Sequence, residues 1–141
     1  MRQSILRSAV GTALLFSGLM AVSAQDRDDS YYSRRDAFFH QEHWQARLFQ
    51  RVRDDLSEVQ STTFPASRDE FRIVKTKEEL GQLQDKLADH RYDAGQLDDV
   101  IAGVQRVIDS NKLSSRDRDM LSDDLNRMRQ YRDHHDDWDR R

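Results

Sequence analysis

The chain of 141 residues contains no cysteine, one proline and only five glycines, and each shortage excludes something. Without cysteine there is no disulfide, no thiol nucleophile, no lipoprotein anchor, no c-type haem attachment and no cysteine-based zinc site. With so few residues that break helices, long helices joined by few turns are expected. The stability of such a domain must come from packing alone.

A basic surface is also missing. The chain has 23 lysines and arginines against 26 aspartates and glutamates, and the two signs of charge are interspersed along it. A general nucleic-acid binder needs a basic surface that displaces counterions from phosphates, and adhesion to anionic lipid needs one as well. We therefore expect no nucleic-acid partner and no adhesion to anionic membranes.

The first 24 residues have the composition of an export signal. Two arginines precede the apolar run Val10–Val22, and the small residues Ser23 and Ala24 follow it at the expected cleavage site. The run is too short to span about 30 Å of hydrocarbon, so no stable membrane insertion is expected, with a retained anchor as the alternative. The predicted localisation is periplasmic or secreted, with 1–24 as signal peptide and 25–30 as flexible leader.

The rest of the chain carries apolar residues at steps of three, four and seven, which is the period of amphipathic helices. The predicted fold is all-α, either an antiparallel four-helix bundle or two helical hairpins. We expect a helical domain over 31–135 and a frayed tail over 136–141. The predicted helices are about 31–61, 67–90, 94–110 and 115–135.

Capping patterns mark where these helices begin. Ser67 with Glu70 forms a capping-box pattern, and similar patterns begin at Asp93 and Ser114. Another begins at Thr76, which leaves open whether the second helix restarts there. We expect one helix, in which Phe71 and Val74 lie off the buried stripe and make a second contact.

Four histidines are weak candidates for metal binding. Such a site generally needs three or four ligands, and the chain has neither cysteine nor an H-E-x-x-H pattern. The alternative is a solvated polar face. Glycine-rich phosphate loops and serine elbows are also missing, so we expect neither an enzyme nor a cofactor. The candidate residues are His40 and His43, three apart, and the adjacent His134 and His135.

Two further features point to polar burial and to binding. Asp124 falls within the apolar stripe of the last helix, so we expect it to be partly buried and paired with an arginine or a backbone amide. Aromatic residues gather at the start of the first helix and form the candidate partner surface, the alternative being that they pack against Phe64, Phe71 and Val74. The candidate surface comprises Tyr31, Tyr32, Phe38 and Phe39.

The segment Leu97–Arg132 carries an LDDVI-type helix, an N-x-L-S turn and an RDRDxLxDDLxRxR helix. In these motifs the chain resembles an uncharacterised family of small exported bacterial helical proteins, which implies an exported helical fold. It is more loosely similar to small helical periplasmic chaperones and metal-stress sensors, without their Leu-Thr-x-x-Gln motif. We expect a non-enzymatic protein-interaction or chaperone-like envelope module that binds protein clients or itself. The alternative is a weakly metal-binding or metal-responsive periplasmic protein.

Overall fold

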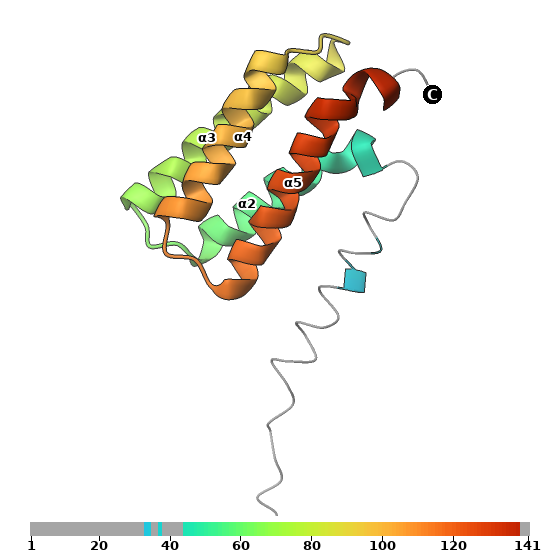
Figure 1. Ribbon diagram of the computed structural model, residues 1–141. Helices are drawn as coiled ribbons and strands as arrows, with labels where there is room; N and C mark the ends of the chain where they lie inside the picture. The colour runs from blue at the N-terminus through green and yellow to red at the C-terminus, as the bar shows by residue number, and fades with distance from the viewer. Residues whose placement is uncertain (1–32, 35–36, 38–43, 139–141) are drawn as a thin grey trace, which may run out of the picture.

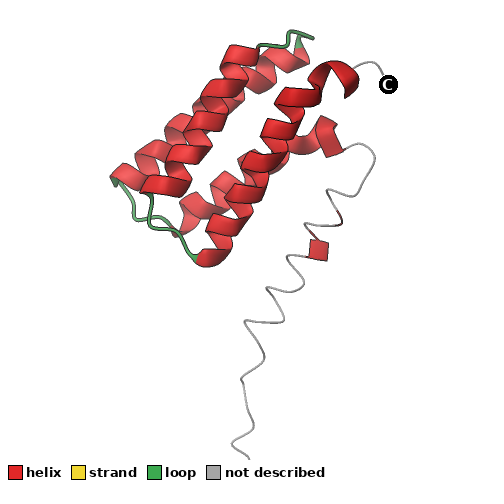
Figure 2. Cartoon of the chain, viewed as in Figure 1, coloured by secondary structure: helices red, strands yellow, loops and turns green. Residues whose placement is uncertain are grey.

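The computed structural model describes residues 33–34, 37 and 44–138 of the chain. Helices joined by short loops dominate this part, and each runs antiparallel to the next (Figures 1 and 2). The long helices are α2 (Trp44–Thr62), α3 (Arg68–Ala88), α4 (Ala94–Ser110) and α5 (Ser115–Trp138).

The helices form a four-helix bundle. α3 packs against α4, α4 against α5, α5 against α2 and α2 against α3, so the ring of contacts closes around one core. Short connections make consecutive helices antiparallel neighbours, and each apolar stripe has to be covered by another helix. Of the two expected arrangements, the bundle is therefore confirmed and a pair of separate hairpins is not needed.

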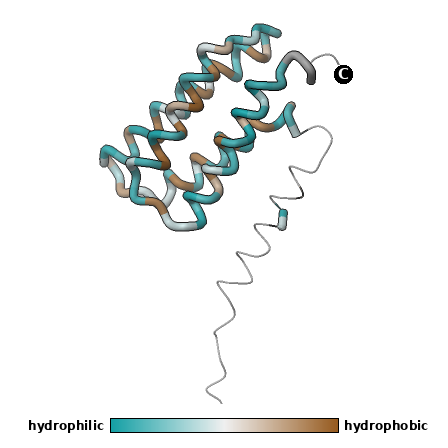
Figure 3. Tube along the Cα trace, in the orientation of Figure 1, coloured by the Kyte–Doolittle hydropathy of each residue, from teal (hydrophilic) through white to brown (hydrophobic). Residues whose placement is uncertain are grey.

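The core is built from the predicted stripes. In Figure 3 hydrophobic positions recur along each helix between hydrophilic ones. Burying one such side chain contributes about 1.5–3 kcal/mol, so the core can hold the fold without a disulfide. The fully buried side chains include Leu48, Val52 and Leu56 of α2, Ile73, Leu80 and Leu83 of α3, Leu97, Val100 and Val104 of α4, and Met120, Leu121 and Met128 of α5.

The predicted caps begin the last three helices. The Ser67 hydroxyl oxygen accepts the Glu70 N–H at 3.1 Å, and the Glu70 carboxylate accepts the Ala66 N–H at 2.6 Å, one residue before the cap. Equivalent bonds run to Asp93 from the Gln96 amide (3.0 Å) and to Ser114 from the Asp117 amide (3.1 Å). Each cap satisfies an amide that has no partner within its helix.

α3 runs unbroken past Thr76, as expected, and there it packs closely against Gly103 of α4. Thr76 is buried, and its hydroxyl donates to the Arg72 carbonyl at 2.8 Å. A Cβ placed on Gly103 of α4 would lie 2.9 Å from the Thr76 Oγ1 and 3.2 Å from the Glu79 Oε2. Gly103 therefore permits a helix approach that no other residue type fits without displacement.

A polar cluster joins the α4–α5 connection to the start of α3. Asn111 is buried; its Oδ1 accepts from Arg72 at 3.0 Å and its Nδ2 donates to the Asp69 carbonyl at 3.0 Å. The Asp69 carboxylate accepts from Arg72 and from the Lys112 backbone N–H, both at 2.9 Å. These bonds tie together segments about forty residues apart in the chain, at the end of the bundle away from the N-terminus of α2.

Two expectations differ from the structure. Phe71 is 70% exposed and therefore makes no buried second contact. α5 continues to Trp138, so the predicted frayed tail is helical over 136–138, where neither glycine nor proline stops the helix.

The contact at Gly103 gives the first prediction. Gly103→Ala should lower the free energy of unfolding by about 1–3 kcal/mol, because the added methyl group overpacks the α3–α4 interface. The measurement is urea unfolding followed by circular dichroism. Gly81→Ala is the control: its Cβ would meet only the flexible end of Arg53, at 3.0 Å, and should gain up to about 1 kcal/mol of helix propensity. Equal effects of the two substitutions would contradict this packing.

The polar cluster gives the second prediction. Asn111→Ala should destabilise the fold by about 1–3 kcal/mol, because it removes two hydrogen bonds from a buried site. Asn126→Ala is the matched control, since Asn126 is exposed in the middle of α5 and alanine favours the helix there. A loss no greater at Asn111 than at Asn126 would show that the cluster contributes nothing.

Candidate functional site

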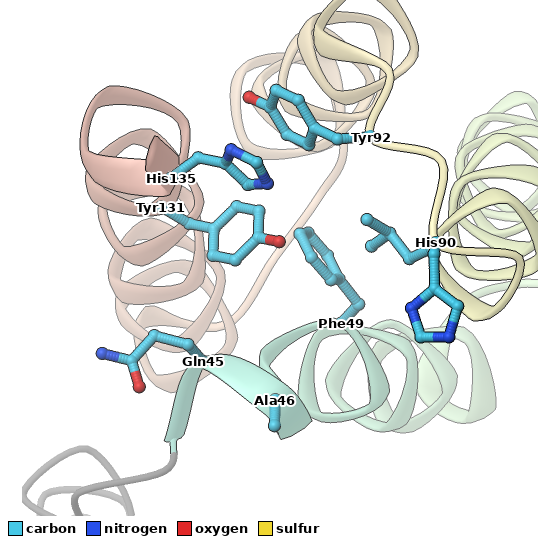
Figure 4. A pocket seen from close by; sticks show the side chains of 8 residues that line it. Gln45, Ala46, Phe49, His90, Tyr92, Tyr131 and His135 are labelled. Atoms are coloured by element: carbon cyan, nitrogen blue, oxygen red, sulfur yellow. The ribbon is translucent and has the colours of Figure 1, made fainter. Parts of the chain in front are cut away.

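A pocket opens at the end of the bundle where α2 begins and the α3–α4 connection turns (Figure 4). We call it the aromatic pocket; its volume is about 250 Å³. The first turns of α2, the connection and the last part of α5 each supply side chains. The lining residues are Gln45, Ala46, Phe49, Leu87, His90, Tyr92, Tyr131 and His135.

The rings of the pocket pack on one another in two modes. Tyr92 and His135 stack, with ring centroids 3.5 Å apart and planes 13° apart. Phe49 and Tyr131 meet edge to face, at 5.1 Å and 87°. Tyr131 and His135 are four residues apart on α5 and therefore share one face of that helix, where their rings lie 5.6 Å apart. Aromatic rings from three separate segments thus form one continuous wall.

His90 stands at the edge of the pocket with a backbone conformation that usually belongs to glycine. Its φ is 57°, in the left-handed region. The His90 N–H donates to the Leu87 carbonyl at 3.0 Å and the Arg91 N–H to the Lys86 carbonyl at 2.8 Å, which together form a Schellman motif that ends α3. Figure 4 shows His90 on the opposite side of the pocket from His135.

Two ion pairs fix the segments that carry the lining residues of the pocket. The Lys86 ammonium donates to the Asp93 carboxylate at 2.6 Å, and this bond, with the Gln96 amide, lowers the pKa of Asp93. The Arg132 guanidinium donates to Asp98 at 3.0 Å, and this bond raises the pKa of Arg132. The first pair fixes the α3–α4 connection that carries His90 and Tyr92. The second ties α5 to α4 next to Tyr131.

The histidines do not assemble into a metal centre within the described residues. No group of three or more histidine, aspartate or glutamate side chains is placed there to hold an ion. His135 belongs to the aromatic pocket, whereas the adjacent His134 is exposed. His40 and His43 lie outside the described residues, so the metal prediction for them stays a prediction.

Two carboxylates are buried on the facing helices α2 and α5. Asp124 is completely buried and Asp55 is 3% exposed, with the Arg51 guanidinium 3.5 Å from the Asp55 carboxylate. On the neighbouring turns, the Arg127 guanidinium lies 5.7 Å from the centre of the Trp44 ring. Our sequence reasoning selected Asp124 and missed Asp55. The same signal was present, because Asp55 falls within the apolar stripe of α2.

A second surface lies at the other end of α2. Phe64 in the α2–α3 connection is 81% exposed, Phe71 is 70% exposed and Val74 is 37% exposed; we call these three residues the α3 apolar surface. A shallow cavity of about 300 Å³ adjoins Val74. Its other lining residues are polar or charged, namely Arg53, Gln60, Lys77 and Glu78. The partner surface predicted at Tyr31, Tyr32, Phe38 and Phe39 lies outside the described residues.

No protein-family model, curated protein or solved structure matches this chain. Over the described ranges, every helix is too short or too polar to cross a membrane.

The backbone of His90 gives the third prediction. His90→Gly should raise the free energy of unfolding by about 1 kcal/mol, because a left-handed conformation costs a residue with a side chain more than it costs glycine. Ala102→Gly, at an exposed position inside α4, should instead lower it by about 1 kcal/mol. Urea unfolding measures both. A destabilised His90→Gly variant would contradict this: the contacts of the imidazole would then stabilise the fold by more than the left-handed backbone of His90 destabilises it.

Proposed function

We propose that this protein is an exported, non-enzymatic helical module that binds apolar segments of other proteins in the cell envelope. The observation that carries the proposal is the α3 apolar surface. Among the side chains that the structure describes, Phe64, Phe71 and Val74 are the large hydrophobic ones left exposed. Phe64 lies in the α2–α3 connection and Phe71 in the first turn of α3, and exposed apolar surface of this kind is typical of interaction sites.

The chemistry of the surface fits a protein partner. Burial of one phenylalanine against a partner contributes about 1.5–3 kcal/mol, and aromatic anchors of this kind dominate the energy of many interfaces. The charged side chains of Arg53, Lys77 and Glu78 beside Val74 supply a polar rim of both signs. Because α3 is rigidly packed on its opposite face, binding here needs no rearrangement of the bundle.

Export rests on the leader sequence. Residues 1–24 combine a basic start, an apolar run and small residues at the expected cleavage site, and the domain that follows uses no cysteine. The aromatic residues Tyr31, Tyr32, Phe38 and Phe39 remain the predicted extension of the partner surface. The metal-responsive alternative stays a prediction for His40 and His43.

The test is the suppression of aggregation of a thermally unfolded client enzyme. The double variant Phe64→Ser, Phe71→Ser should need at least about tenfold more protein for the same protection, because it removes more than 1.4 kcal/mol of apolar contact. The matched control is Ala102→Ser, Asn126→Ser, which changes exposed positions on α4 and α5 and should protect as the wild type does.

Two outcomes would contradict the proposal. One is a wild-type chain that gives no protection at any ratio to client. The other is a double variant that protects as well as the wild type while circular dichroism shows both folded. Sedimentation of the wild type as a dimer, lost in the double variant, would identify the partner as a second copy of the chain.

A further inference from the structure

We propose that the aromatic pocket binds one uncharged aromatic ring, of the size of phenol or indole. The ring belongs either to a free small molecule or to a tyrosine or tryptophan side chain of a bound protein segment. The pocket lies at Gln45, near the start of α2, and the α3 apolar surface begins beyond the end of α2. Val74 of that surface adjoins Arg53 and Gln60 of α2, which do not line the aromatic pocket, so the two sites share no lining residue and can be tested separately.

The volume of the pocket limits what it can hold. Pockets that bind drug-sized molecules enclose about 300–1,000 Å³. At about 250 Å³ the aromatic pocket has room for one small ring system. A nucleotide, a lipid chain or a folded helix is too large for it.

The side chains that line the pocket favour an uncharged ligand. Its eight side chains are aromatic, aliphatic, amide or imidazole groups, and none is a carboxylate, an ammonium or a guanidinium. An ionic ligand would give up hydration there without meeting a fixed charge of opposite sign. The imidazoles of His90 and His135 do not form part of a metal site within the described residues. These observations favour a neutral ligand over an ion.

The rings of the wall favour an aromatic guest. Phe49 and Tyr131 already meet edge to face, and Tyr92 and His135 already stack. An aromatic ligand can pack against these rings in the same two geometries. Tyr131 extends from α5 toward Phe49, with His135 beside it on the same helix and His90 on the other side of Phe49 (Figure 4).

The experiment is a titration of the full mature chain, followed by side-chain NMR signals of His90, His135 and Tyr131. The free-molecule arm uses phenol and indole, and the side-chain arm uses N-acetyl-tyrosine amide and N-acetyl-tryptophan amide. We expect saturable shifts with phenol or indole. Saturation by the amides as well assigns the ring to a protein side chain, and saturation by phenol and indole alone assigns it to a free molecule.

A substitution at the mouth of the pocket tests the location. Ala46→Leu should lower the affinity at least tenfold by filling the cavity, and it should fold normally because Ala46 is exposed. Ala102→Leu places the same side chain on an exposed position of α4 outside the pocket and should leave the affinity unchanged. Circular dichroism checks that both variants are folded.

Three results would overturn the inference. The first is the lack of a saturable shift with every ring compound. The second is an unchanged affinity in folded Ala46→Leu. The third is benzoate binding as tightly as phenol, because a carboxylate should be rejected by a pocket without a fixed cation.

Discussion

The structure depends on the mutual burial of four apolar stripes, one from each helix, without any disulfide cross-link between the helices. Each of α2 to α5 contributes fully buried side chains to one core, and the chain has no cysteine to reinforce it. Within this core, α3 and α4 approach each other closely at Gly103 and Thr76. Polar ties at both ends of that pair, at Asn111 and at Asp93, hold it in register. The α3–α4 pair is therefore the frame on which α2 and α5 pack.

The two candidate binding features arise where this burial stops. α3 carries more apolar side chains than its buried stripe can use, and Phe71 with Val74 faces solvent on the outer side. At the other end, the last turns of α5 and the first turns of α2 meet the α3–α4 connection through rings that enclose a cavity. The core thus presents one exposed apolar surface and one small open pocket.

The sequence predicted what local rules decide. Caps and periodicity placed α4 at 94–110, and the structure has it at Ala94–Ser110, because Asp93 begins the helix and Asn111 ends its hydrogen bonding. Long-range features were not predictable in this way. The off-stripe position of Phe71 was visible, but its exposure depends on the lack of a covering element in the described part. The pocket joins residues from Gln45 to His135, and the left-handed conformation of His90 has no signal in a residue that is not glycine. Asp55 was missed although the reasoning applied to Asp124 fits it equally.

The central claim is that the four helices are one cooperative unit, and residue-resolved amide hydrogen exchange tests it most directly. The slowest amides should lie at the buried positions of all four helices, for example Val52, Leu80, Val104 and Leu121. They should share one free energy of exchange, equal to that of global unfolding, since no helix can bury its stripe alone. Exchange of the α2 or α5 core amides at a clearly lower free energy than those of α3 and α4 would contradict the account. The bundle would then be a stable α3–α4 hairpin with two loosely attached helices.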